Sequence, residues 1–336
     1  MPKKILVSII ILLFSSSIAM GQDPKKGVIV NKDDVKRIIA VDLGSKDGVK
    51  VGSAYVLHDE NDRELSCILV ARVEEDMFWS DLIPMGSFAD IEIGFHVEEL
   101  GSGCRIEGVE VKYVPGGFFG MGDNKKDNEM PMRGVELKDF YIDKYEVTNE
   151  QYKIFMFDKK REAPHLNTPE AGPYNWKDNN FPEGKEDYPV VLVTHQDAKD
   201  FCEYMGKRLP TEAEWEKAAR GTGSRIWPWG NVWDARKLNS LESGVGHTAI
   251  IGSFPDDLSP YDVMDMGGNV SEWTSSEYAP YKNNFKGDEN YNKGYLVIRG
   301  GSFIYGKSES RAPSRKYMDP NAKSIGVGIR CVKDIN

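Results

Sequence analysis

Short β-type apolar runs alternate with turn residues through the N-terminal third of the chain. Three such runs occupy residues 38–41, 53–57 and 65–70. The segment 44–52, between the first two runs, contains three glycines, which can adopt the positive φ angles of tight turns. We therefore predict that residues 23–100 form a small all-β barrel or sandwich module of about five or six strands. This block contains no cluster of catalytic residue types, so we expect a packing or adaptor role.

The pattern changes in the C-terminal two thirds, where helical periodicity is confined to a few segments. Helices are predicted over residues 149–157 and 194–205, and a third begins at Thr211. Thr211 and Glu214 have the spacing of a capping box, and Gly221 ends that helix. The remaining sequence consists of short strand-like runs and turns. The whole chain has 33 glycines and 7 tryptophans, a composition that favours a loop-rich globule held by aromatic packing.

Residues 1–22 have the pattern of a signal peptide. Two lysines precede an apolar run over residues 5–19, and Ala19 and Gly21 are small residues suited to cleavage. The run is shorter than the ~20 residues that cross a bilayer, and no cysteine follows it to carry a lipid. We therefore predict a periplasmic, cell-surface or secreted protein with no transmembrane segment after cleavage.

Charge and cysteine content narrow the possible functions. The formal net charge of −10 argues against nucleic-acid binding, which requires clustered Lys and Arg, and suits a soluble envelope protein. The four cysteines are Cys67, Cys104, Cys202 and Cys331, which allow three disulfide connectivities in an oxidising compartment. None belongs to a CxxC motif and the five histidines are scattered, which argues against a structural zinc site.

Eight motif blocks follow one another in the C-terminal region. They are PGGFFGMG (115–122), FYIDKYEVTNEQY (140–152), YPVVLV (188–193), KRLPTEAEWE (207–216), WPWG (227–230), GGNVSEW (267–273), RGGSF (299–303) and GIRC (328–331). Their order resembles that of the formylglycine-generating-enzyme, or sulfatase-modifying factor, domain over residues 111–334. The resemblance implies an irregular, loop-rich α+β fold related to the C-type lectins. In that fold most of these residues are scaffold.

The resemblance also implies a structural calcium site. Its ligands would come from Asp265, Gly268, Val270 and Glu272, as two side chains and two backbone carbonyls in a glycine-rich turn. Such oxygen ligands are those that calcium favours. A solvated acidic turn is the alternative interpretation. Asn239 and Ser240 match the first ligands of a second family calcium site, but the aspartate expected next is replaced near Ser243.

A disulfide and a catalytic centre are likewise implied by the family. Secreted members join the cysteines that match Cys202 and Cys331. The enzymes bind Cu(I) through two cysteines just after the GGSF strand, and the matching positions here are Tyr305 and Ser310. Soft thiolates suit Cu(I), whereas a phenol and a hydroxyl do not. The sequence therefore argues against copper and against formylglycine generation.

A polar segment surrounds these two positions. We expect its residues to lie together on a surface loop and to form a recognition cleft, with a plain solvated loop as the alternative. These residues are Tyr305, Lys307, Glu309, Ser310, Arg311, Ser314, Arg315, Lys316 and Tyr317.

Two functions are compatible with the sequence. The first is a non-catalytic exported protein that binds a peptide, protein or glycan partner in the cell envelope, or is structural there. The alternative is a divergent metal-dependent oxidoreductase or protein-modifying enzyme of the same family, using ligands other than cysteine.

Overall fold

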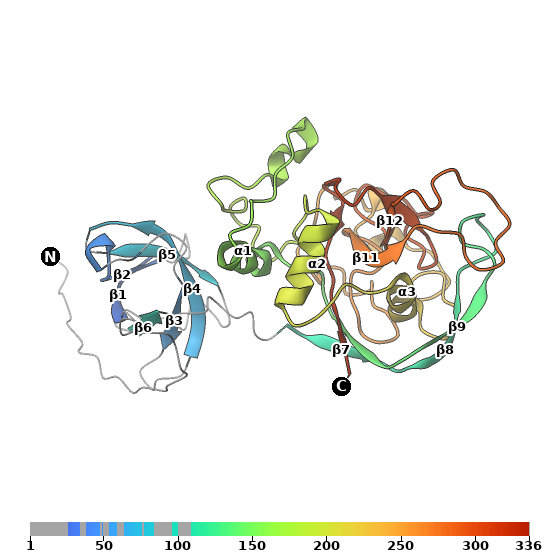
Figure 1. Ribbon diagram of the computed structural model, residues 1–336, viewed down its shortest axis with the longest axis horizontal. Helices are drawn as coiled ribbons and strands as arrows, with labels where there is room; N and C mark the ends of the chain where they lie inside the picture. Colours follow the sequence, from blue (N-terminus) through green and yellow to red (C-terminus); the bar gives the residue numbers. More distant parts are fainter. Residues whose placement is uncertain are drawn as a thin grey trace. The chain divides into compact units, whose positions relative to one another are not determined.

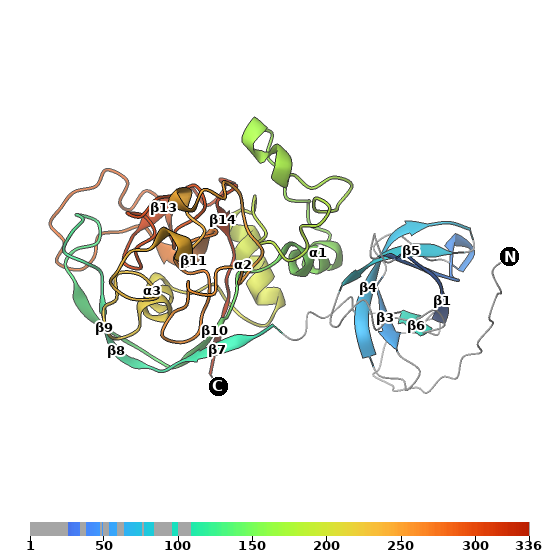
Figure 2. The same ribbon diagram turned by 180° about the vertical axis from the view of Figure 1, so that it is seen from behind.

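The computed structural model in Figures 1 and 2 describes the chain in several stretches. They are residues 26–33, 38–47, 49, 54–58, 64–75, 77–83, 96–99 and 109–335. The expected signal peptide, residues 1–22, and Cys104 lie outside the described residues. The chain divides into two compact units: residues 1–108 with the short segment 156–161, and residues 109–155 with 162–336.

The N-terminal unit is a closed antiparallel barrel with strand order β1-β2-β5-β4-β3-β6 (Figure 1). Its strands are β1 (Lys26–Asp33), β2 (Ile38–Val41), β3 (Ala54–His58), β4 (Glu64–Val73), β5 (Phe78–Ile83) and β6 (His96–Glu99), with a 3-10 turn η1 (Ser45–Asp47). Tyr55 and Leu57 alternate along β3 and are fully buried, as are Ile29 and Val70. Because the barrel is closed, every strand has a neighbour on both sides, and the inward-facing side chains of this small sheet form its core.

The C-terminal unit contains three small sheets with strand orders β15-β10-β7, β13-β12-β11-β14 and β8-β9. The strands are β7 (Val111–Val114), β8 (Gly117–Met121), β9 (Arg133–Leu137), β10 (Phe140–Asp143), β11 (Ser271–Glu277), β12 (Leu296–Arg299), β13 (Lys316–Met318), β14 (Val327–Gly328) and β15 (Val332–Asp334). Phe140 of β10 pairs with Val114 of β7 on one side and Asp334 of β15 on the other. The two ends of this unit therefore meet in one sheet.

Its helices are α1 (Asn149–Asp158), α2 (His195–Tyr204) and α3 (Glu212–Arg220), with 3-10 turns η3 (Pro169–Tyr174), η4 (Ala235–Lys237) and η5 (Leu241–Ser243). The capping box predicted for α3 is confirmed: the Thr211 hydroxyl accepts from the Glu214 amide, and the Glu214 carboxylate accepts from the Thr211 amide. Gly221 ends the helix at φ 65°. Among the described residues, no helix combines the length and the hydropathy needed to cross a membrane.

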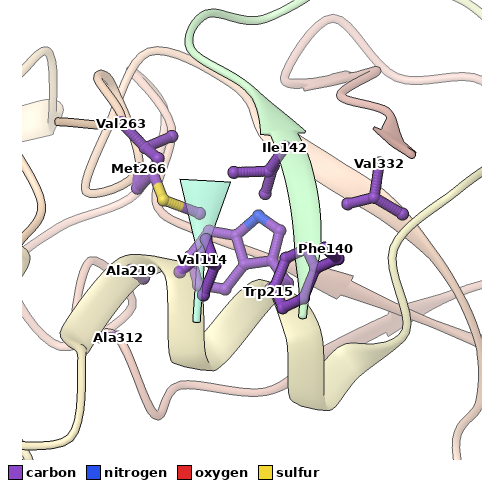
Figure 3. Packing of buried hydrophobic residues seen from close by; sticks show 10 residues of the cluster. Val114, Phe140, Ile142, Trp215, Ala219, Val263, Met266, Ala312 and Val332 are labelled. Carbon is purple, nitrogen blue, oxygen red and sulfur yellow. The ribbon is translucent and has the colours of Figure 1, made fainter. Parts of the chain in front are cut away.

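Trp215 of α3 lies at the centre of the main hydrophobic cluster (Figure 3). It packs with Val114 of β7 and with Phe140 and Ile142 of β10, and its indole nitrogen donates to Glu272 Oε2 at 2.5 Å. The motif that contains Trp215 is therefore scaffold, as predicted. Its helix positions β11, which carries Glu272, and thereby the loops that follow.

Candidate functional site

The segment after β12 is fixed by a close backbone contact. A Cβ added to Gly301 would lie 2.1 Å from the carbonyl oxygen of Gly267, so only glycine fits there. Gly300 beside it has φ 82°. The RGGSF and GGNVSEW motifs are thus packed against each other, and the loop that begins at Tyr305 leaves the core at a defined point.

Tyr305 and Ser310 are the residues that the family resemblance matches to the two copper-binding cysteines. The ring of Tyr305 lies under the Lys316 ammonium, with Nζ 5.0 Å from the ring centroid. Lys316 Nζ donates to the Gly300 carbonyl, and burial lowers the pKa of this amine to about 7. Ser310 is fully buried and its hydroxyl donates to the Gly306 carbonyl at 3.0 Å. Both positions are therefore held by backbone and side-chain contacts that involve no thiol.

The expectation of a surface loop is wrong for Ser310, Arg311, Ser314 and Arg315, which are all buried. The two guanidinium groups neutralise buried carboxylates from other segments. Arg311 forms two hydrogen bonds to Glu129, at 2.6 and 2.9 Å, and Arg315 contacts Glu212 of α3 at 2.6 Å. A buried carboxylate without such a cation would be strongly destabilising.

The remaining members of the expected cleft contact different neighbours. Lys307 lies over the rings of Trp227 and Trp233, and Glu309 pairs with Lys126. Tyr317, 37% exposed, stacks between Tyr278 and Tyr295, with ring centroids 4.4 and 5.1 Å away. The side chains of this segment thus contact partners from several other segments of the unit.

The expected calcium turn lies in a buried acidic region. Asp265 and Glu272 are 2% and 1% exposed, and Glu146 and Asp257 are also buried. The only cation that hydrogen-bonds to any of the four carboxylates among the described residues is Arg330, which donates to Glu272 Oε1 at 2.7 Å. Burial raises the pKa of Asp265 to about 6 and raises the pKa of Glu146 and of Asp257 well above their ordinary values.

These contacts bear on whether calcium fits. The region holds four buried carboxyl groups and one hydrogen-bonded cation, Arg330, and Asp265, at φ 62°, accepts from the Gly252 amide at 2.6 Å. A divalent cation would favour the ionised form of these carboxyl groups and pair with it. Glu272, however, already accepts from Arg330 and Trp215, so it would have to share its oxygens with the ion. Within the described stretches, no group of three or more His, Cys, Asp or Glu side chains is placed to hold a metal ion. The expected calcium site combines two carboxylates with two backbone carbonyls, so this finding does not test it.

Asn239 and Ser240, the matches to the second calcium site, participate in local hydrogen bonds. The side-chain amide of Asn239 donates to the His247 carbonyl at 2.9 Å and to the side-chain oxygen of Asn269 at 3.1 Å. The backbone carbonyl of Asn239 accepts from the backbone amide of Asn269. Ser240 donates to Glu242 at 3.1 Å. In the structure Asn239 is therefore hydrogen-bonded to the GGNVSEW turn, whereas the bond of Ser240 is local to η5.

Cys202 of α2 and Cys331 form a disulfide with a Cα–Cα distance of 5.6 Å and a sequence separation of 129 residues. Both side chains are fully buried. The bond ties α2 to the segment just before β15, and the Arg208 and Val332 backbones pair beside it. The pairing implied by the family resemblance is therefore present in the structure.

A pocket of ≈ 470 Å³ lies in this unit, and its lining includes residues from three of the motif blocks as well as residues outside them. Its walls are mostly apolar and include Pro173, Tyr174, Tyr188, Val191, Phe303 and Ile325. Only Phe303 belongs to a motif block beside the expected catalytic positions. Prolines and tyrosines recur between residues 169 and 191, but this composition alone does not distinguish a pocket wall from an ordinary loop.

Comparison with known proteins agrees with this scaffold. The sulfatase-modifying factor enzyme 1-like domain matches residues 98–335. The chain belongs to this family. Inactive C-alpha-formylglycine-generating enzyme 2 of Bos taurus is 29% identical over 290 residues, which cover 69% of this chain and 90% of the relative. Formylglycine-generating enzyme of the same species is 29% identical over 279 residues, or 66% and 74% of the two chains.

The solved structure of PvdO from Pseudomonas aeruginosa shares the fold. Its TM-score is 0.54 at 24% identity, covering 67% of this chain and 94% of PvdO. The predicted irregular α+β fold of the sulfatase-modifying factor family is thereby confirmed.

Proposed function

We propose that this chain is an exported, non-catalytic sulfatase-modifying factor protein that recognises a peptide, protein or glycan partner in the cell envelope. The observation that carries the proposal is the pair Tyr305 and Ser310, which replaces the two thiols expected of an active enzyme within an otherwise intact scaffold. A phenol and a hydroxyl are hard donors that bind Cu(I) poorly.

Export has support from two separate features. The first 22 residues have the composition of a signal peptide, and the Cys202–Cys331 disulfide belongs to a protein that matures in an oxidising compartment. A fusion of residues 1–30 to a reporter that works only outside the cytoplasm tests this. Reporter activity supports export, and activity lost on replacing the apolar run with polar residues identifies the signal.

The test of non-catalysis is oxygen uptake by the purified protein with thiol-containing peptides, after incubation with Cu(I) and separately with Fe(II). We expect no peptide-dependent uptake and no aldehyde product. Turnover with either metal would overturn the proposal and favour a divergent oxidoreductase.

We further propose one structural calcium ion at Asp265, Gly268, Val270 and Glu272. It would pair with the buried carboxyl groups described above and hold the turn. EDTA is expected to lower the melting temperature, and added Ca²⁺, but not Mg²⁺, to restore it. An Asp265→Asn variant should lose this response, whereas Asp234→Asn, at an exposed 3-10 cap, should keep it. An unchanged melting temperature in EDTA contradicts the calcium site.

A further inference from the structure

Four tyrosines of the C-terminal unit are stacked in a row that runs from a buried ring to an exposed one. The ring centroid of Tyr278 lies 4.9 Å from that of Tyr291 and 4.4 Å from that of Tyr317. Tyr317 in turn lies 5.1 Å from Tyr295. The spacing between Tyr278 and Tyr317 is below the about 4.5–7 Å that is usual for aromatic pairs.

Backbone pairing holds these rings at their spacing. The Tyr278 amide, just after β11, donates to the Tyr295 carbonyl at 2.8 Å, and the Asn292 amide donates to the Tyr278 carbonyl at 3.0 Å. Tyr317 belongs to β13 and is paired with Val297 of β12. Two groups that the fold holds in contact react far more readily than the same groups free in solution. The pair Tyr278 and Tyr317 is therefore arranged for a reaction between the two rings.

A proton acceptor is in place at Tyr278. Its hydroxyl donates to Asp288 Oδ2 at 2.7 Å and accepts from the Asn128 amide at 3.1 Å. Partial burial acts to raise the pKa of Asp288, but hydrogen bonds from Asn290 and Tyr278 outweigh it and lower this pKa, so the carboxylate is ionised at neutral pH. A phenol that loses an electron becomes a strong acid, and a carboxylate at hydrogen-bond distance takes the proton. The guanidinium of Arg315, 5.2 Å from the ring centroid, disfavours a cationic ring and so favours this proton loss.

An oxidant can reach the row of rings at Tyr317. This ring is 37% exposed, whereas Tyr278 is fully buried and Tyr291 and Tyr295 are partly buried. Because Tyr317 and Tyr278 are in contact, an electron can pass from the buried ring to the exposed one. Oxidation that starts at the surface therefore extends to Tyr278.

We propose that Tyr278 and Tyr317 form a site of oxidative modification, at which hydrogen peroxide acting through a haem peroxidase joins the two rings as dityrosine. Two one-electron oxidations convert the phenols to phenoxyl radicals, and one proton passes to Asp288 and the other to water. The radicals form a carbon–carbon bond between positions ortho to the hydroxyls, and the ring hydrogens at these positions then restore the two phenols. The protein loses two hydrogen atoms in total, and these reduce one peroxide molecule to two molecules of water. The proposal is independent of the recognition function.

The test is oxidation of the purified full protein with hydrogen peroxide and a haem peroxidase. We expect dityrosine fluorescence in the monomer, a mass lower by two hydrogen atoms, and joined peptides that contain Tyr278 and Tyr317. The cross-link connects the segment after β11 to β13 across β12, so the oxidised protein should melt at a higher temperature. Tyr317→Phe keeps a ring in the stack and should lose both the cross-link and the increase.

A second tyrosine pair serves as the matched control. Tyr113 of β7 and Tyr141 of β10 have ring centroids 5.8 Å apart. Tyr113 is 47% exposed and its hydroxyl also donates to a carboxylate, that of Asp139, at 2.8 Å. Tyr113→Phe should leave the cross-link and its rate unchanged. Asp288→Asn, which replaces the carboxylate with a much weaker base, should slow the cross-link at neutral pH. Circular dichroism of the untreated variants establishes that each one folds.

Several results would overturn the assignment. The first is an oxidised protein without dityrosine. The second is dityrosine that maps only between molecules or to Tyr113, because the spacing of Tyr278 and Tyr317 then confers no preference. The third is an equal yield of the monomer cross-link in Tyr317→Phe. An unchanged rate in Asp288→Asn would contradict the role of that carboxylate as the proton acceptor.

Discussion

Lys316 shows how one side chain shapes the surroundings of Tyr305. Its amine lies over the Tyr305 ring and donates to the Gly300 carbonyl. The sequence predicted the loss of the two thiols from the identities of residues 305 and 310. It did not predict that Arg311 and Arg315 would turn inward, because their carboxylate partners are distant in sequence.

Lys316 should make stability depend on pH in a defined direction. Its folded-state pKa of about 7 lies below that of the unfolded chain, so between pH 7 and the unfolded pKa the unfolded state binds more protons. The free energy of unfolding should therefore rise with pH across this window, by up to about 1.4 kcal/mol per unit. Arg299, Glu309, Lys126 and Glu129 are the charged groups that act on the amine, with Arg299 the strongest.

Urea denaturation at pH 7, 8 and 9 measures this slope. Lys316→Met should flatten it, whereas Lys286→Met, at an exposed lysine, should leave it intact. Parallel profiles for the wild type and Lys316→Met would contradict the depressed pKa.

At the scale of elements, the sequence predicts features that depend on neighbouring residues and misses features that depend on contacts between distant segments. The start and end of α3 could be predicted because Thr211, Glu214 and Gly221 act on their own neighbours. The pocket could not, since its walls come from segments as distant in the sequence as those around Asn149, Tyr174, His247, Phe303 and Ile325. A periodic pattern along one segment does not show which distant segments that segment will contact.

The α3 cap should contribute measurably to stability. Thr211→Ala removes the hydroxyl that accepts from the Glu214 amide, and we expect a loss of about 1 kcal/mol in the free energy of unfolding. Thr168→Ala is the matched control, because Thr168 occupies the N-cap of η3 but makes no side-chain cap hydrogen bond. Equal losses for the two variants would show that the Thr211 bond does not stabilise the helix. Chemical denaturation followed by circular dichroism gives both values.

At the scale of the whole molecule, the C-terminal unit is closed by long-range links. The β15-β10-β7 sheet joins its two ends, and the Cys202–Cys331 disulfide ties α2 to the segment before β15. The family resemblance implied this bond, whereas composition alone left three connectivities open. The order of the motif blocks predicted most of the fold, whereas the buried ion pairs became known only from the structure.

Removing the disulfide should destabilise this unit. For a loop of 129 residues the chain-entropy model gives about 5 kcal/mol. A Cys202→Ala/Cys331→Ala variant is expected to unfold at much lower urea concentration than the wild type, and reduction should shift the wild type toward it. A wild-type midpoint that does not change on reduction, with thiol release verified by mass, would contradict the stabilising role.

The central claim is that this sulfatase-modifying factor scaffold lacks the copper chemistry of the family's enzymes. Competitive titration with Cu(I) against a chromogenic chelator tests it most directly, using the wild type and a Tyr305→Cys/Ser310→Cys variant. We predict no tight stoichiometric binding by the wild type and one tightly bound ion in the double variant, because two thiolates then occupy the positions that the family resemblance matches to its copper-binding cysteines. Tight one-to-one binding by the wild type, lost on Tyr305→Phe, would contradict the claim.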